Sequence, residues 1–385
     1  MAFLANKTVN RLHLHSAIYV LASAGGGVFF GAFLLKAGTP VPTILCAYAL
    51  INLGRFCFRP LVLMAAKRVG LRPLVVFGSV LLALQYPVLA QVHGVGWALL
   101  ALCTVATLGE TFYWTAYHTY YGQVGDAEHR GHQTSAREAV SALVGIVAPV
   151  AGGWALATLG PHAAFGAVAL VQTLAVLPLL GMPNVAVPSE VEAPYIGVEP
   201  GFWMYLANGW IGAGTAVVWQ VVLFISLSQS FTAFGGAMAL AALASAALGL
   251  VLGRRLDGGK GVHAAWLSFA VLTVTILLRA VADTPALAVA ANALGAFVAT
   301  IYYPTHMTAA YNMAARAPCP FRFQMAWEAG WDIGRGAACL LAAAMVALGA
   351  PLQATLLLSL IGVVAMLILL RRYYTGVAAA AAVAA

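Results

Sequence analysis

Seven ionisable residues lie inside long apolar stretches of this sequence, where a charge is costly to place. They are Arg55, Arg59, Glu110, Glu138, Glu328, Asp332 and Arg335. At the centre of a lipid bilayer, one charged side chain costs about 2.5–3.5 kcal/mol even on a lenient insertion scale. Residues kept at such positions carry ions, bind substrates or pair with one another, so all seven are candidate functional residues.

Glu110 has the properties of a proton carrier. It lies about fourteen residues into the apolar run 96–121, and no basic residue stands within one helical turn of it in the sequence. A buried carboxylate without a partner favours its neutral form, so it can bind and release a proton near physiological pH. We expect Glu110 to couple proton movement and His118, two helical turns further on, to relay the proton. The alternative for both residues is a structural hydrogen bond to a neighbouring helix.

Two further groups of charges have helical spacing. Arg55 and Arg59 are four residues apart and share one helix face, as do Glu328, Asp332 and Arg335. At 1.5 Å per residue, Arg55 lies at about the depth of Asp332, and Arg59 at about the depth of Glu328. The two groups can therefore pair if their helices are neighbours. Two alternatives remain open: Arg55 or Arg335 binds an anionic substrate, or Arg335 pairs with Asp332 on its own helix.

The composition indicates which elements hold these residues. Of 385 residues, 63% are apolar and 8% are charged, against about 25% charged in an ordinary soluble domain. A membrane-spanning helix needs about 20 apolar residues, so this apolar content corresponds to about twelve helices. The composition excludes a soluble globule, a coiled coil, a disordered chain and a nucleic-acid-binding protein.

Glycine, proline and charged residues divide the chain into twelve apolar segments. We expect each to be a transmembrane helix, because backbone polar groups in lipid must pair within their own segment. The expected spans are 14–35, 41–66, 73–92, 96–121, 137–158, 161–182, 201–228, 231–253, 262–281, 286–310, 324–348 and 351–371. Fourteen of the nineteen Lys and Arg residues then lie on the side of the N-terminus and two, one of them Arg279, on the other. This bias predicts a multi-pass protein of the bacterial inner membrane with both termini in the cytoplasm.

The chain divides into two halves that repeat each other. We expect an N-terminal six-helix bundle (1–182), a proline-rich cytoplasmic linker (183–200), a C-terminal six-helix bundle (201–375) and a frayed alanine-rich tail (376–385). Ala-Arg-Glu-Ala at 136–139 matches Ala-Trp-Glu-Ala at 326–329, an offset of 190 residues, and Thr-Phe-Tyr-Trp at 111–114 matches Thr-Ile-Tyr-Tyr at 300–303. Such matches predict a parallel internal repeat of six helices.

Two motifs resemble those of the major facilitator superfamily. The loop Ala-Lys-Arg-Val-Gly-Leu-Arg at 66–72 is similar to the signature loop between helices two and three, with Lys67 where the family has Asp. The run Gly-Ile-Val-Ala-Pro-Val-Ala-Gly-Gly at 145–153 is similar to the signature of proton-coupled efflux members, with Ala148 in place of one Gly. The resemblance implies an all-α membrane protein of two pseudo-symmetric six-helix bundles. It also implies a monomer with a central cavity lined by spans one, four, seven and ten, working by alternating access.

The resemblance makes spans two and eleven neighbours. We therefore expect ion pairs Arg55–Asp332 and Arg59–Glu328, which would close the cytoplasmic side and break when that side opens. Glu138, the repeat mate of Glu328, is expected to meet Arg254 or the adjacent Arg255 in the same way.

Aromatic and polar residues cluster on the expected cavity helices. The predicted substrate-binding residues are Tyr113, Trp114, Tyr117, Asn208, Trp210, Gln220, Asn292, Tyr302, Tyr303 and His306. A mostly apolar pocket with few polar groups suits a small amphipathic organic compound. A copper site at His306, Met307, Met313 and His118 is a weaker alternative, because no repeated metal-ligand spacing is present.

These features together predict a secondary transporter rather than an enzyme, with no catalytic residues, no metal and no cofactor beyond the proton gradient. The first hypothesis is proton-coupled export of a small amphipathic organic compound. The second is proton-coupled uptake of an organic anion, with Arg55 or Arg335 as the counter-charge. A non-transporting membrane receptor on the same scaffold is the third. The expected partners are the substrate and the lipid bilayer, with no nucleic acid.

Overall fold

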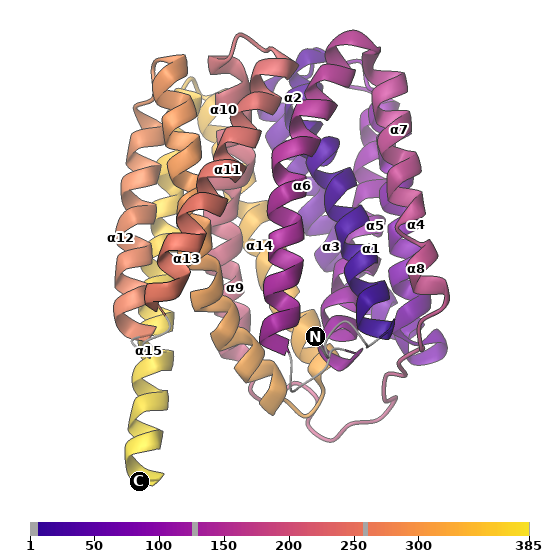
Figure 1. Ribbon diagram of the computed structural model, residues 1–385, viewed down its shortest axis with the longest axis vertical. Coiled ribbons are helices and arrows are strands. Elements are labelled where there is room, and N and C mark those ends of the chain that lie inside the picture. Colours follow the sequence, from indigo (N-terminus) through magenta and orange to yellow (C-terminus); the bar gives the residue numbers. More distant parts are fainter. Residues whose placement is uncertain (1–6, 125–129, 257–260, 385) are drawn as a thin grey trace.

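The structure is a computed structural model that describes residues 7–124, 130–256 and 261–384. Within these ranges, side chains are described outside 124–142, 248–265, 299–301, 303–304 and 377–384. All regular secondary structure in this part of the chain is helical, as the composition predicted. Most helices run along the long axis of the molecule, and both chain ends lie toward the same end of it (Figure 1).

The order of the helices follows the expected spans. The first half of the chain contains α1 (Lys7–Gly25), η2 (Gly27–Phe29), α2 (Phe30–Lys36), α3 (Val41–Val69), α4 (Leu71–Leu89), α5 (Trp97–Val124), α6 (Arg130–Thr158), α7 (Gly160–Leu174) and α8 (Leu177–Leu180). The second half contains α9 (Glu199–Gly212), η3 (Ala213–Val218), α10 (Trp219–Ser226), α11 (Phe231–Leu256), α12 (Gly261–Ala280), α13 (Pro285–Arg316), α14 (Pro320–Ala347), η4 (Leu352–Leu358) and α15 (Ser359–Ala384).

Length and hydropathy identify the membrane-spanning helices among the described residues. Six segments are long and apolar enough to cross a membrane: Lys7–Lys36, Val41–Val69, Leu71–Leu89, Gly160–Leu180, Glu199–Ser226 and Leu352–Gly376. Shorter apolar helices occur at Leu143–Thr158, Phe231–Ala247, Trp266–Ala280 and Pro285–Val298. Helices α5 and α14, which carry Glu110, Glu328 and Asp332, complete the set of twelve spans.

The last helix includes the alanine-rich tail, for which the sequence analysis expects fraying: α15 continues to Ala384. Alanine has the highest intrinsic helix propensity of all residues, so a run of alanines extends a helix that already exists.

Two pairs of helices connect the halves of the chain. Helix α3 packs against α14, and α6 packs against α11. Helices α1, α4, α5 and α7 lie on one side of these pairs, and α12, α13 and α15 lie on the other (Figure 1). Charges carried on α3 and α14 therefore face each other between the halves.

The contact between α6 and α11 depends on glycine. A Cβ added at Gly153 would lie 2.4 Å from the carbonyl oxygen of Phe231, and one at Gly235 would lie 2.3 Å from that of Pro149. A Cβ added at Gly152 would come even closer to the carbonyl oxygen of Gly25 on α1. The glycines of the 145–153 motif thus let α6 approach both neighbours to backbone contact, as small residues do in membrane helix packing.

The loop between α3 and α4 is fixed by the segment that follows α8. Gly70 adopts φ +78°, which favours glycine. The side chain of Asn184 donates a hydrogen bond to the carbonyl oxygen of Val69 at 2.7 Å, and it accepts one from the amide of Arg72 at 3.1 Å. This anchors the end of α3, the helix that carries Arg55 and Arg59.

The seventh span is interrupted by a π-helix, η3, between α9 and α10. A π-turn shifts the register of the side chains that follow it, and such turns are common at functional sites. The carbonyl oxygen of Thr215 within η3 accepts a hydrogen bond from Arg279 Nη1 at 3.2 Å. The seventh span is therefore tied at this point to the end of α12.

We expect Gly235→Ala to destabilise the protein by about 1–3 kcal/mol, because the added methyl group collides with the backbone of α6. The measurement is the melting temperature of the purified protein in detergent. The matched control is Gly236→Ala, where an added Cβ meets nothing within 4 Å. Equal melting temperatures for the two variants would contradict the proposed backbone contact.

Candidate functional site

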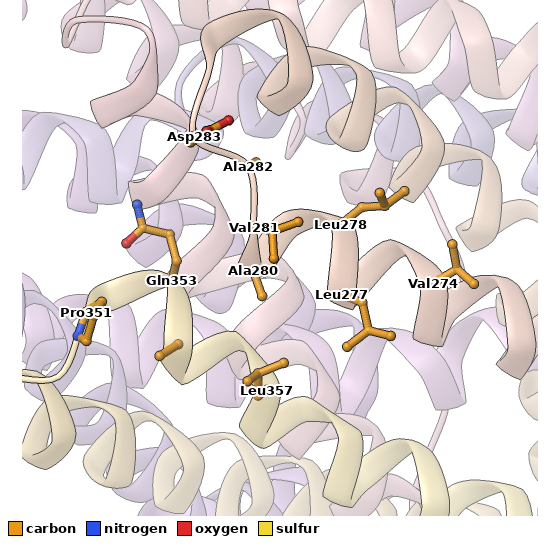
Figure 2. Close-up of a pocket in the computed structure, with 11 residues that line it drawn as sticks. Val274, Leu277, Leu278, Ala280, Val281, Ala282, Asp283, Pro351, Gln353 and Leu357 are labelled. Atoms are coloured by element: carbon orange, nitrogen blue, oxygen red, sulfur yellow. The ribbon is translucent and has the colours of Figure 1, made fainter.

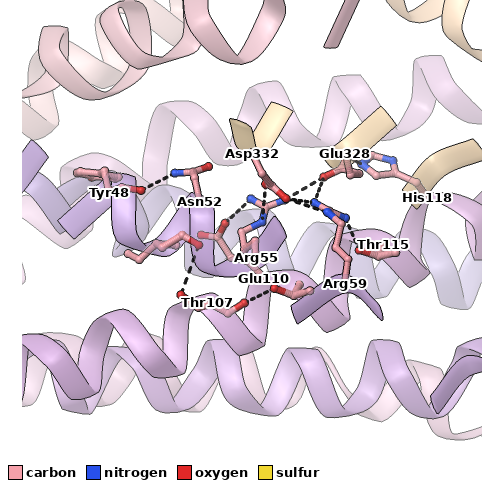
Figure 3. Close-up of polar contacts among 12 residues, drawn as sticks. Tyr48, Asn52, Arg55, Arg59, Thr107, Glu110, Thr115, His118, Glu328 and Asp332 are labelled. Atoms are coloured by element: carbon pink, nitrogen blue, oxygen red, sulfur yellow. Dashed lines mark hydrogen bonds and ion pairs between the residues drawn. The ribbon is translucent and has the colours of Figure 1, made fainter. Parts of the chain in front are cut away.

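Four charged side chains meet between α3 and α14 (Figure 3). Arg55 Nη2 lies 2.9 Å from Glu328 Oε2, and Arg55 Nε lies 3.1 Å from Asp332 Oδ1. Arg59 Nη2 lies 3.5 Å from Glu328 Oε2, and its Nε and Nη2 both donate to Asp332 Oδ2. Each arginine therefore bridges both carboxylates, and all four residues are buried.

Both contacts of the predicted ladder, Arg55–Asp332 and Arg59–Glu328, are present. The shorter contacts are the crossed ones, Arg55–Glu328 and Arg59–Asp332. The two carboxylates are one helical turn apart on α14, and a guanidinium presents its donors in a fork that can span them. Helical spacing therefore indicates which helices pair but not which atoms are closest.

Glu110 has a basic partner, contrary to the expectation that it stands alone. Arg55 Nη1 donates to Glu110 Oε2 at 2.7 Å. The partner comes from α3, 55 residues earlier in the chain, so a search within one helical turn of Glu110 could not find it. The Glu110 side chain is 32% exposed, against 6% for Glu328 and 0% for Asp332. It is the accessible carboxylate of the network.

Two polar residues of α5 extend the network. Thr115 Oγ1 accepts a hydrogen bond from Arg59 Nη1 at 2.7 Å. His118 Nε2 lies 3.7 Å from Glu328 Oε1, so a protonated His118 would form an ion pair with that carboxylate. His118 thus lies beside the network, next to Glu328 rather than Glu110.

The network contains three carboxylates and two arginines. When every group is ionised, its formal charge is −1. Buried charges need partners, because desolvation costs several kcal/mol for each ion that is not compensated. One bound proton brings the network to neutrality.

A central cavity of about 580 Å³ adjoins the network. A smaller lobe of about 240 Å³ continues it toward α1 and α4. Glu110, Gln220 and Arg335 line both spaces. The larger space is enclosed by residues of α3, α5 and the second half of the chain, so a molecule bound there would contact both halves.

The structure places half of the predicted substrate-binding residues in the wall of the larger cavity. These are Trp114, Asn208, Gln220, Asn292 and Tyr302. Tyr302 donates a hydrogen bond to Asn208 Oδ1 at 2.7 Å, which fixes the Asn208 amide at the cavity surface. His306 does not line the cavity; it lies behind the wall, where its Nε2 is 3.4 Å from Asn208 Nδ2.

The other aromatic residues predicted for the pocket point elsewhere. Tyr113 and Tyr117 are buried in an aromatic cluster with His15, whose Nε2 lies 2.9 Å from the Tyr113 hydroxyl. Trp210 donates to the carbonyl oxygen of Leu358 at 2.8 Å, toward the last span. A helix that lines a cavity also has faces that pack within its own bundle, and these three residues lie on such faces. Glu138, Arg254, Arg255 and Tyr303 lie outside the described side chains.

Arg335 faces the cavity without a carboxylate partner in the described part of the chain. The local pair with Asp332 is not formed, because Asp332 is engaged by Arg55 and Arg59. The guanidinium carbon of Arg335 lies 5.3 Å from the ring centroid of Trp331 and 5.9 Å from that of Tyr48. Arg335 therefore presents a cation on an aromatic surface at the junction of the two lobes.

The sequence analysis did not predict that Arg279 lines the cavity. It was placed on the far side of the membrane, but the structure buries it to 6% exposure in the last turn of α12, where it lines the cavity. The available signal was its position inside the expected span 262–281 rather than in the loop after it. Trp219 and Trp331 were also missed as wall residues.

A separate hollow of about 730 Å³ lies between α12 and η4 (Figure 2). Its walls are mostly Leu, Val and Ala, with Asp283 and Gln353 at one end. It shares no lining residue with the central cavity, and Asp283 is the one charged residue among those that line it. Among the described residues, no group of three His, Cys, Asp or Glu side chains is placed to hold a metal ion.

The chain belongs to the Major Facilitator Superfamily, whose family model matches residues 47–321. The fold agrees with this membership. The protein is thus an integral multi-pass membrane protein with the family and fold of a secondary transporter rather than of an enzyme.

Solved transporters share this fold across almost the whole chain. A POT family transporter in complex with 5-aminolevulinic acid matches with a TM-score of 0.71, 11% identity, and coverage of 95% of this chain and 96% of that one. The human organic anion transporter MFSD10 (TETRAN) matches with a TM-score of 0.69, 16% identity, and coverage of 94% and 99%. The nucleoside transporter NupG matches with a TM-score of 0.66, 12% identity, and coverage of 96% and 99%. A search among curated proteins finds no match.

We expect Arg59→Met to destabilise the protein by about 3–5 kcal/mol, because it leaves buried carboxylates without their counter-charge. Adding Asp332→Asn should restore most of that loss by removing one negative charge. A double-mutant cycle of melting temperatures in detergent measures the coupling. Arg68→Met, at an exposed position of α3, is the control and should change little. A double variant no more stable than Arg59→Met would argue against charge balance in the network.

Proposed function

We propose that this protein is a proton-coupled secondary transporter that moves a small amphipathic organic anion through the central cavity by alternating access. The observation that carries this proposal is Arg335, a cation with no carboxylate partner among the described residues, which lines the cavity beside aromatic rings. An anionic group of the substrate would supply the missing counter-charge. The apolar and aromatic wall would hold the rest of the molecule.

Glu110 is the proposed proton site. The network has one carboxylate more than it has arginines, and Glu110 is its most exposed carboxylate. Protonation of Glu110 would neutralise the network and weaken its hold on Arg55. The energy source would be the proton gradient, with no resident cofactor, and the working unit a monomer.

The proposed geometry couples the proton and the anion in the same direction. Protonating Glu110 raises the positive charge of the cavity, which strengthens the binding of an anion, and a bound anion favours protonation by the same factor. Binding of both on one side and release of both on the other is symport. The ion pairs between α3 and α14 are the proposed gate, because separating these helices breaks them.

A second candidate function is export of an amphipathic cation by proton antiport. Two observations favour it: the 145–153 run resembles the efflux signature, and its glycines bring α6 against α11 in the structure. A cationic substrate would compete with the proton for Glu110, so one would bind as the other left. The charge of the transported compound therefore separates the two functions.

In proteoliposomes with an imposed pH gradient, we expect transport of an organic anion by the wild-type protein to be accompanied by proton movement. Glu110→Gln should show no such proton movement, because the amide cannot release a proton. The panel comprises an anion, a neutral amide and an ammonium ion built on the same aromatic ring. Glu199→Gln, at an exposed position, is the control.

Three results of that experiment would change the proposal. Proton movement driven only by the ammonium compound, in the opposite direction, would support antiport instead. Equal proton-coupled transport by wild type and Glu110→Gln would make Glu110 structural and direct attention to Glu328 and Asp332. If none of the three compounds moved protons with the wild-type protein, that result would contradict proton coupling.

Arg335→Gln should weaken anion binding by about 10- to 100-fold, since a hydrogen bond to a charged group contributes about 1.5–3 kcal/mol. Arg335→Lys should restore part of the affinity, because it keeps the charge but loses the planar fork. Ligand-induced thermal stabilisation of the detergent-purified protein gives the dissociation constants. Arg316→Gln, at an exposed position of α13, is the control. Unchanged affinity in Arg335→Gln would remove this residue from the site.

A further inference from the structure

Besides Arg55 and Arg335, the cavity wall contains Arg279, an arginine that the transport cycle proposed above does not require. Arg279 is buried, and its guanidinium carbon lies 4.6 Å from the ring centroid of Trp219. Its hydrogen bonds go to two backbone carbonyl oxygens, those of Ala291 at 3.4 Å and Thr215 at 3.2 Å. These are its only acceptors among the described residues, and neither carries a formal charge.

A guanidinium has five N–H donors, and the two recorded bonds use one on Nε and one on Nη1. Both donors of Nη2 are without a partner among the described residues. Nη2 lies against Gly295, where an added Cβ would be 1.9 Å away. Because Gly295 has no side chain, Nη2 packs directly on the backbone of α13 at the cavity wall, which Gly295 and Arg279 both line.

A purely structural role does not explain why a buried arginine stands at position 279. A buried charge without a counter-ion is strongly destabilising, and a neutral side chain could satisfy the Thr215 and Ala291 carbonyls. Both Arg279 and Arg335 line the same cavity. Each lies beside a tryptophan that also lines the cavity, Arg279 beside Trp219 and Arg335 beside Trp331. The cavity therefore offers two cationic groups without carboxylate partners among the described residues, each next to an aromatic ring.

The charges of the whole site indicate what would neutralise it. Arg55, Arg59, Arg279 and Arg335 give four positive charges. Glu328 and Asp332 give two negative charges once Glu110 is protonated. The proton-loaded site therefore has a formal charge of +2, which a dianion would balance and a monoanion would not.

We propose that Arg279 binds a second anionic group of the substrate, so that the transported compound is a dicarboxylate with an apolar body between its two carboxylates. One carboxylate binds Arg335 and the other binds Nη2 of Arg279. This inference rests on the proposed function, since it requires that the cavity bind organic anions.

The test measures dissociation constants for the full-length protein in detergent. The probes are linear α,ω-dicarboxylates of graded length and aromatic diacetates, each paired with the monocarboxylate of equal length. At the matching length, the dicarboxylate should bind wild-type protein about 10- to 100-fold more tightly than its monocarboxylate partner. Arg279→Gln should abolish that advantage and leave the monocarboxylate affinity unchanged, whereas Arg335→Gln should weaken both.

Two further variants keep the test valid if Arg279→Gln does not fold. Arg279→Lys keeps the charge, and Gly295→Ala keeps the arginine but displaces Nη2; both should selectively weaken the dicarboxylate. Lys36→Gln removes an exposed cation in the first span and should change nothing. Retained monocarboxylate binding shows that a variant is folded.

The outcomes separate this inference from the proposed function. Suppose that monocarboxylates bind the wild-type protein but no dicarboxylate binds more tightly than its monocarboxylate partner. The inference is then overturned and the proposed function stands. The same conclusion follows if a dicarboxylate binds more tightly and keeps this advantage in Arg279→Gln. If neither class binds wild-type protein, anion transport itself is wrong.

Discussion

The structure depends on four buried charged side chains that meet between the two halves of the chain. Arg55 and Arg59 on α3 and Glu328 and Asp332 on α14 are each costly to bury alone, so the arrangement is stable only while they compensate one another. The half-buried Glu110 on α5 adds a third carboxylate at the edge of this group. The need for this compensation fixes how α3 lies against α14. Separating these helices would break the ion pairs between them. In the proposed cycle, a proton and an anion change the charge balance that holds the pairs together.

The contacts between the halves differ in kind. Helices α6 and α11 meet through glycine backbones, where the contact is short-range and depends on shape. Helices α3 and α14 meet through ion pairs, which respond to protons and ligands. A rocking motion can preserve the first contact as a pivot while it breaks the second. The cavity adjoins the ion pairs, so a bound molecule can influence the contact that has to break.

Much of the fold could be predicted from the sequence, because hydropathy and the pairing of backbone groups in lipid leave few alternatives to a bundle of helices. Helical spacing and depth, together with the family resemblance that makes spans two and eleven neighbours, also placed Arg55 and Arg59 opposite Glu328 and Asp332. The sequence could not show that Glu110 meets Arg55, since that contact joins separate helices. Nor could it tell which faces of a cavity helix turn inward: Trp114 lines the cavity, whereas Tyr113, its neighbour, packs within the bundle. Arg279 was missed because the charge bias of loops assigns a residue to a side of the membrane, not to an orientation.

The π-helix η3 has a consequence for how this protein compares with its relatives. A π-turn accommodates an extra residue within a helix that otherwise keeps its direction. Because the π-turn takes up one residue more than an α-turn, removing one residue between Ala213 and Val218 would restore a regular helix and leave Trp219 and Gln220 facing the cavity. A span with a regular helix could thus gain a residue here and keep its ligand contacts on α10. An alignment that confines gaps to loops would conceal that event.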